Sequence, residues 1–193
     1  MKGRPTLFDN KDLVSKAQRV FWEKGYTATS LSDLLEVTGI GSGSFYNSFK
    51  GGKKEVFKAA ILQRREAFNN FRKELEISGT PLELIKDFFR SIAKSATEEN
   101  LRGCIVANTV VEMTFVDDEL EADAVRILKD VEKMFADVFE KEKLKGNLSN
   151  PLSGQVLGRY LMTFWCGLNT LRRIYPDEKI LAEQIEMQLD LLR

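Results

Sequence analysis

The chain contains no histidine, only two cysteines and four prolines among its 193 residues. The missing imidazole excludes histidine-based catalytic triads and histidine-ligated metals. Cys104 and Cys166 lie far apart and cannot form a zinc site alone, so each is expected to be a small buried hydrophobic residue in a reducing compartment. No apolar run approaches the roughly 18 residues of a membrane helix. We therefore expect a cytoplasmic protein that binds no metal or cofactor, does not enter the membrane and is not an enzyme.

Charge is distributed unevenly along a chain whose formal net charge is zero. Residues 1–54 hold nine basic and five acidic side chains, a net charge of +4, so residues 55–193 carry −4. Apolar residues make up 43% of the chain and charged residues 30%, which is typical of a globular protein. A basic N-terminal region on an acidic body predicts an anionic partner at the N-terminal end.

Apolar spacing and helix-terminating residues predict an all-α protein of about nine helices, with no strand alternation of useful length. Ser30 and Asp33 have the spacing of a capping box, and Gly39 is suited to the left-handed conformation that ends a helix. The expected helices occupy residues 10–24, 31–38, 42–49, 53–78, 81–97, 105–116, 118–144, 151–175 and 178–193.

The two short helices expected between Ser30 and Phe49 have the layout of a helix-turn-helix, in which the second helix enters the major groove. Phe45 and Phe49 are one turn apart and should face inward, while small hydrogen-bonding residues surround them. Gly43 leaves room for a close approach to DNA. From these residues alone, an ordinary solvated helical hairpin is an equally good interpretation.

Two motifs resemble those of the tetracycline-repressor (TetR) family of regulators. The segment Phe21-x-x-Lys24-Gly25-Tyr26-x-x-Thr29-Ser30 is similar to the family's FxxxGYxxTS motif, and Gly43–Lys50 is similar to its recognition helix. The resemblance covers roughly residues 9–60. The sequence departs from the family pattern at Gly41, at Ser42, where lysine is common, and in the additional residue of Gly51-Gly52.

The resemblance implies roles for individual positions. It assigns phosphate contacts to Thr29, Tyr46 and Lys50. It places Ser42, Ser44, Asn47 and Ser48 near base edges or the sugar-phosphate chain. Lys2 and Arg4 precede the first helix and are expected either to reach a neighbouring groove or to form a disordered solubilising tail.

The resemblance further implies that residues 1–52 form the DNA-binding domain and that residues 53–193 bind an effector and form a dimer. The expected effector pocket, with ordinary core packing as the alternative, comprises Phe88, Phe89, Cys104, Asn108, Met113, Phe115, Tyr160, Phe164 and Trp165. Two heptad-like stripes predict a dimer interface, with each stripe facing its own subunit's core as the alternative. The interface residues are Leu157, Leu161, Leu168 and Leu171, with Phe164 in the same stripe, followed by Leu181, Ile185, Leu189 and Leu192.

These features together predict an all-α transcriptional regulator, most simply a repressor. It would bind a near-palindromic double-stranded operator as a homodimer, and a small, apolar effector would release it. Two alternatives come from other classes: an all-α carrier or enzyme with a hydrophobic pocket, and a helical adaptor whose basic hairpin binds an acidic protein.

Overall fold

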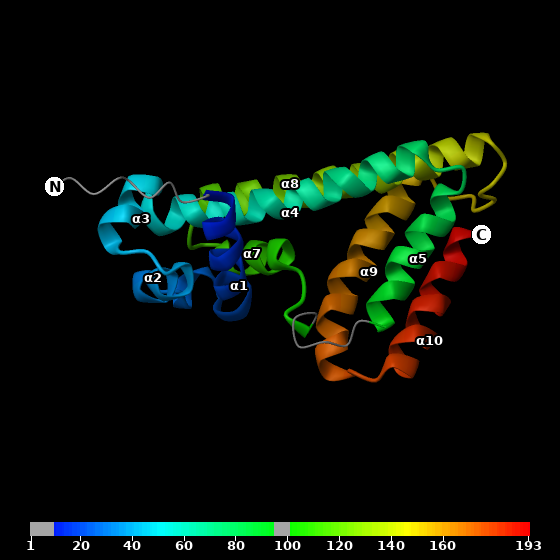
Figure 1. Cartoon of the computed structure of the whole chain (residues 1–193). Coiled ribbons are helices and arrows are strands. Elements are labelled where there is room, and N and C mark those ends of the chain that lie inside the picture. The colour runs from blue at the N-terminus through cyan, green and yellow to red at the C-terminus, as the bar shows by residue number, and fades with distance from the viewer. Residues whose placement is uncertain (1–9, 95–100) are drawn as a thin grey trace.

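The computed structural model describes residues 10–94 and 101–193, and within these ranges every regular element is helical. The first three helices, α1 (Asn10–Ala28), α2 (Leu31–Thr38) and α3 (Ser42–Ser48), gather at one end of the molecule (Figure 1). The all-α prediction is confirmed. Lys2 and Arg4 lie outside the described residues.

Helix boundaries in this end follow the capping residues. Ser30 and Asp33 form a reciprocal capping box at the start of α2, and Gly39 ends that helix in the left-handed conformation. The regular part of α1 is interrupted at Gly25, where φ is +82°, and one further turn leads to Ala28. A side chain at Gly25 would be strained for a second reason: its Cβ would lie 3.0 Å from the Glu112 carboxylate.

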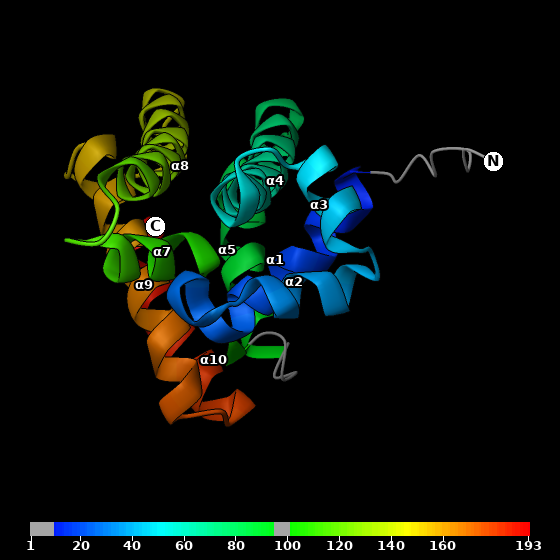
Figure 2. The ribbon, with the colours of Figure 1, turned by 90° about the vertical axis from the view of Figure 1, so that its left-hand side faces the viewer.

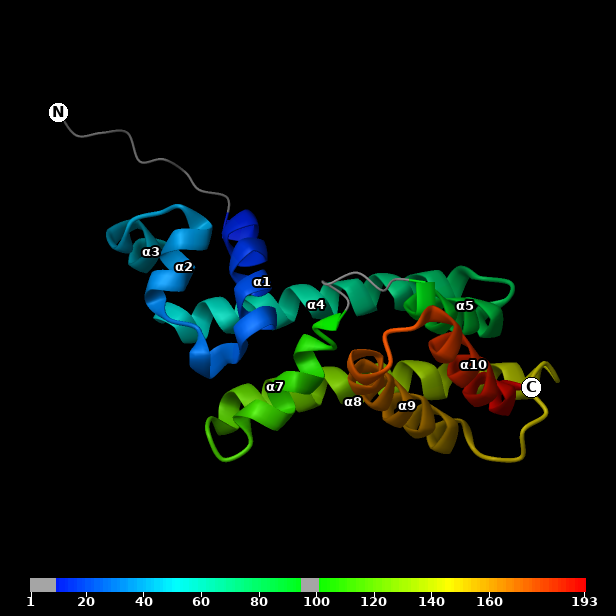
Figure 3. The same ribbon diagram turned by 90° about the horizontal axis from the view of Figure 1, so that it is seen from below.

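The larger part of the molecule is built on two long helices, α4 (Gly52–Ile77) and α8 (Asp118–Leu144), which run along its length (Figures 1 and 3). Helix α7 (Ile105–Met113) lies beside the three-helix end, and α5 (Pro81–Lys94), α9 (Gly154–Ile174) and α10 (Glu178–Leu189) form the opposite end. A short 3-10 turn, Asp190–Leu192, closes the chain. Within the described ranges, no helix combines the length and apolar composition that a membrane crossing requires.

Two apolar clusters hold these helices together. The first joins α1, α2, α3 and the beginning of α4 to α7 and the beginning of α8, with Phe21, Phe57 and Met113 fully buried in it. The second joins the end of α4 to α5, α8, α9 and α10, around Phe89 and Phe139. Since α7 and α8 contribute to the first cluster, the three-helix end is packed directly onto the larger part.

Helices α8 and α9 approach each other unusually closely at two glycines of α9. A Cβ added at Gly154 would lie 2.5 Å from the carbonyl oxygen of Ala136, and one at Gly158 would lie 2.8 Å from that of Glu132. Cβ atoms do not occupy such positions without a backbone shift, so both glycines are required by the packing distance between the two helices.

Candidate nucleic-acid interface and effector cavity

One face of α3 packs into the first apolar cluster, and the opposite face is exposed to solvent. Ile40, Phe45 and Phe49 are buried, and the Phe45 and Phe49 rings lie 5.5 Å apart. The residues that α3 exposes are therefore fixed in position by its buried aromatic side. The exposed set consists of Gly41, Ser42, Gly43, Ser44, Tyr46 and Asn47, with Lys50 just beyond the helix and Ser48 half-buried. Figure 2 shows α3 at the outer edge of the three-helix end.

Thr29 is placed differently from the other predicted DNA contacts. Its side chain is buried, with 1% of the residue exposed, and its hydroxyl donates a 2.6 Å hydrogen bond to the Gly25 carbonyl. Lys53 completes this turn by donating to the carbonyls of Tyr26, at 3.0 Å, and Thr29, at 2.9 Å. In this conformation the Thr29 hydroxyl stabilises the turn before α2 and is not presented to solvent.

The lysines near α3 are not equivalent. Lys54 pairs with Asp117 and Glu119, which raises the pKa of the ammonium. The pKa of the Asp117 carboxyl is lowered by Lys54, and that of Glu119 by Lys58 and then Lys54. The Lys24 ammonium pairs with Asp33 at 2.6 Å. Lys50 is exposed and forms no ion pair with any described residue. The basic charge predicted from composition is thus partly neutralised by internal pairs, and Lys50 retains its charge for an external anion.

Hydrogen bonds and an ion pair between Arg102 and Glu23 connect α1 to the region around α7. The Glu112 carboxylate accepts hydrogen bonds from the backbone N–H groups of Tyr26, at 2.9 Å, and Thr27, at 2.7 Å. The indole N–H of Trp22 donates to the Gly103 carbonyl at 3.0 Å. Any shift of residues 103–112 therefore acts directly on α1. No local sequence pattern indicates this contact, because Tyr26 and Glu112 are 86 residues apart in the chain.

A cavity of about 280 Å³ lies next to the Trp22–Gly103 contact, between α1, α4, α5, α7 and α9. Of the predicted pocket residues, Phe88, Cys104 and Trp165 line it. The others do not line it: Phe89 packs in the second cluster, Met113 packs in the first, Asn108 and Phe115 are exposed, and Tyr160 and Phe164 lie nearer the start of α9 and pack against the second cluster.

Several residues that line this cavity are not among the predicted ones, and three of them carry a charge or an indole: Trp22, Arg64 and Arg172. Arg172 had a detectable signal, because it lies four residues after Leu168 and so continues the buried stripe of α9. Trp22 and Arg64 had none, since they come from helices that meet the cavity only through tertiary packing.

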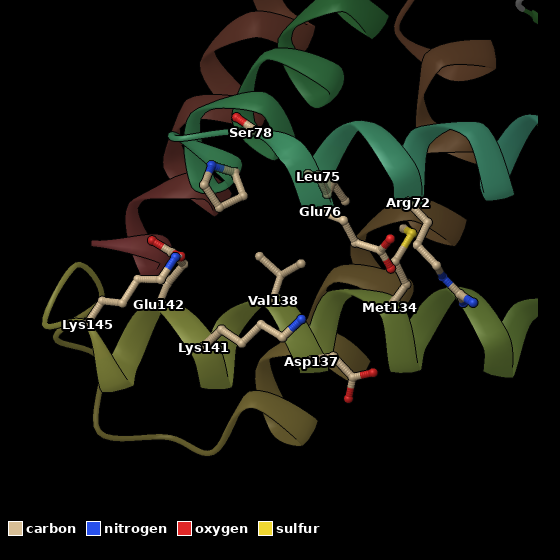
Figure 4. Close-up of a pocket in the computed structure, with 11 residues that line it drawn as sticks. Arg72, Leu75, Glu76, Ser78, Met134, Asp137, Val138, Lys141, Glu142 and Lys145 are labelled. Atoms are coloured by element: carbon tan, nitrogen blue, oxygen red, sulfur yellow. The ribbon is translucent and has the colours of Figure 1, made fainter.

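A second cavity, of about 100 Å³, lies at the opposite end of α4, against α8 (Figure 4). Its charged side chains are of both signs, including Arg72, Glu76 and Lys141. The buried Glu142 carboxylate beside it is already bound by Lys145 and Asn147, each at 2.7 Å. This balanced lining favours no particular ligand. Among the described residues, no group of three or more suitable side chains could hold a metal ion.

The two leucine stripes of α9 and α10 are placed mainly inside one subunit. Seven of the predicted interface residues are buried in the second apolar cluster: Leu157, Leu161, Leu168, Leu181, Ile185, Leu189 and Leu192. Leu171 is the exception, with 37% exposed. The outer faces of both helices nevertheless carry a different apolar set, which we term the outer apolar face. It consists of Val156, Leu171, Ile174 and Tyr175 with Ile180, Met187 and Leu191.

Comparison with known proteins supplies independent information. The family model described as "Bacterial regulatory proteins, tetR family" matches residues 13–60. The chain is 30% identical, over 193 residues, to the uncharacterized HTH-type transcriptional regulator YezE of Bacillus subtilis (strain 168), which covers 98% of this chain and 99% of that protein. It is 26% identical over 160 residues to the HTH-type transcriptional repressor DhaR of Mycobacterium sp. (strain GP1), covering 80% of this chain and 77% of DhaR.

Among solved structures, the fold is similar to that of a cysteine mutant of the TetR family transcriptional regulator CifR, complexed with a 26-bp double-strand operator DNA. The TM-score is 0.81 at 23% sequence identity, and the match covers 99% of this chain and 100% of that one.

Proposed function

Because this chain belongs to the TetR family and is a DNA-binding transcriptional regulator, we propose that it is a cytoplasmic repressor, and not an enzyme, that binds a near-palindromic operator as a dimer. Residues 1–52 would bind DNA, and residues 53–193 would bind the effector and form the dimer. One observation carries this proposal: the exposed face of α3 is polar, and its opposite face is aromatic and buried. The operator-bound state of CifR, a protein of the same fold, supports it.

The test is selection of bound fragments from genomic DNA, followed by binding measurements over a range of salt concentrations. We expect a sequence with two-fold symmetry whose half-sites lie roughly 34–36 Å apart, in successive major grooves. Selection of no sequence in preference to random DNA would contradict the proposal.

On DNA, the exposed residues divide into two groups. Tyr46 and Lys50 would contact phosphates and so contribute affinity without sequence preference, whereas Ser42, Ser44, Asn47 and Ser48 would lie near base edges or the sugar-phosphate chain. Thr29 would act by holding the turn before α2, since its hydroxyl is bound to Gly25. Lys2 and Arg4 would extend the contact from the N-terminal side.

Lys50→Ala is expected to weaken binding to operator and to random DNA alike, because Lys50 forms no ion pair within the described part of the chain and would neutralise one phosphate. The slope of log affinity against log salt should fall by about one unit. Lys141→Ala removes an exposed lysine from the far end of α8 and serves as the control with an unchanged slope. An unchanged slope in Lys50→Ala would remove Lys50 from the interface.

Gly43→Ala is expected to weaken DNA binding without destabilising the protein. A Cβ at Gly43 meets no atom within 4 Å in the free protein, and alanine favours the helical conformation by up to about 1 kcal/mol over glycine. On DNA, the same methyl group would occupy the space between α3 and the groove. Thermal unfolding and operator titration together make the test, and unchanged operator affinity would place Gly43 away from DNA.

Effector release would act through the ties between α1 and residues 103–112. A ligand in the 280 Å³ cavity touches Trp22 and Gly103, the two partners of one tie, and α7 carries Glu112, which holds the end of α1. The ligand can shift the DNA-binding helices only by as much as its affinity differs between the two arrangements.

A further inference from the structure

The lining of the 280 Å³ cavity combines aromatic walls with unopposed positive charge. Trp22, Phe68, Phe71, Phe88 and Trp165 supply the apolar surface. Two guanidinium groups, Arg64 and Arg172, also line it, and no described carboxylate does. The volume is close to the lower end of the range for small-molecule sites, about 300 Å³, so a ligand here is small.

Arg172 differs from the other residues of this lining because its charged side chain is buried. Only 7% of it is exposed, and its Nε is buried without a hydrogen-bond partner. Within the described residues it forms no ion pair or hydrogen bond, and burial lowers the pKa of its guanidinium. Arginine nevertheless stays protonated in proteins. A charged group removed from water without a counter-ion is costly, and an anion in the cavity would offset that cost.

Neighbouring groups favour an anion at the same place. The Arg64 guanidinium lies over the Trp22 ring, 4.7 Å from its centroid, so a second positive charge faces the aromatic wall. Helix α7 begins at Ile105 with no side-chain cap from Cys104, which lines the cavity. The first N–H groups of a helix have no intrahelical acceptor and carry partial positive charge.

We propose that this cavity binds a small organic acid, with an apolar, preferably aromatic, body against Trp22, Phe88 and Trp165 and a carboxylate paired with Arg172. Guanidinium and carboxylate match in geometry and form two parallel hydrogen bonds. That this acid is also the effector rests on the proposed function. It sharpens the expectation of a purely apolar effector by adding the charged end that Arg172 requires.

Three acids provide the test in binding experiments with the full-length protein without DNA: benzoate, 3-phenylpropanoate and octanoate, each paired with its neutral amide. Both tryptophans of the chain line the cavity, so intrinsic fluorescence reports occupancy beside calorimetry. We expect 3-phenylpropanoate to bind at least tenfold more tightly than 3-phenylpropanamide. Binding of none of the three acids, or equal binding of acids and amides, overturns the proposal.

Arg172→Met separates ligand binding from packing, because methionine retains much of the side-chain length and loses the charge. We expect the variant to lose the preference for acid over amide while the melting temperature of the ligand-free protein stays the same or rises. Arg159→Met is the matched control, since Arg159 is an exposed arginine of the same helix, and it should keep the preference. An unchanged preference in Arg172→Met would overturn the proposal.

A measurement on the unmodified protein keeps the proposal falsifiable even where Arg172→Met does not fold. Iodide and caesium ions both quench tryptophan fluorescence, and a positively charged cavity admits only the anion readily. We expect iodide to quench the two tryptophans severalfold more strongly than caesium at equal ionic strength. Equal quenching, or stronger quenching by caesium, contradicts an anion site.

Two outcomes distinguish effector release from the class of ligand that the cavity binds. An acid that binds at Arg172 but leaves operator affinity unchanged would refute effector release and leave the ligand class intact. Operator binding that persists with no acid bound in any assay would refute the ligand class alone.

Discussion

Leu171→Glu is expected to convert the dimer into a monomer of 22 kDa and to abolish most operator binding. Leu171 belongs to the outer apolar face of α9 and α10, whose residues are 37% to 59% exposed in the single subunit. In a two-fold dimer each copy would place a carboxylate against its partner's apolar surface, where an unpaired charge is costly. Sedimentation at micromolar concentration measures the assembly. Loss of the second half-site should reduce operator affinity by about 10²- to 10⁴-fold.

Two further variants make this result specific. Leu144→Glu introduces the same charge at a leucine that is 89% exposed at the end of α8, and it should remain dimeric. Leu168→Glu lies three residues before Leu171 but is 1% exposed in the subunit's own core, so it should unfold the protein rather than yield a folded monomer. A wild-type protein that sediments as a monomer, or a Leu171→Glu variant that stays dimeric, would contradict dimer formation through this face.

Gly158→Ala is expected to destabilise the protein strongly, because α9 packs closely against α8 at this residue. Its Cβ would lie 2.8 Å from the carbonyl oxygen of Glu132 and 3.1 Å from the backbone nitrogen of Ala136, so α8 and α9 must separate. Overpacking of this kind costs about 1–3 kcal/mol, which corresponds to a fall in melting temperature of roughly 3–10 °C for a chain of this size.

Gly167→Ala is the matched control for this change. It adds the same methyl group to the same helix, at a position with no atom within 4 Å, so the helix-forming preference of alanine should raise stability slightly. Both variants are best compared in the Leu171→Glu background, where no second copy covers Gly167. Equal melting temperatures would show that the two helices separate without cost.

Both ends of α2 could be predicted from sequence because they depend on local chemistry. Ser30 with Asp33 and Gly39 each impose a backbone geometry that neighbouring residues alone determine, and the structure has these residues in the expected roles. Other ends differ from the expectation: α1 continues past Gly25 to Ala28, and α7 ends at Met113 rather than near residue 116. The inward direction of Phe45 and Phe49 follows equally from helical spacing.

Tertiary placement could be predicted only in part. Helical periodicity identifies a stripe such as Leu157, Leu161 and Leu168, but it does not distinguish a stripe that faces its own core from one that faces a second subunit. Here the more regular stripe is internal, and the outer apolar face is the less regular one. The burial of Thr29, and of an Arg172 side chain that has no partner among the described residues, depends on segments far away in sequence, so no local pattern reveals either.

The first apolar cluster limits how this regulator can be recombined with its relatives. The core that supports α1–α3 also includes Ile105 and Met113 of α7 and Leu120 of α8. A chimera joined near residue 52 would therefore combine core residues from two different proteins that had not evolved to pack against each other. Exchange of operator specificity is therefore expected to succeed by grafting the exposed residues of α3 alone. Transfer of the whole N-terminal segment would also have to carry over its matching partners on α7 and α8, including Glu112.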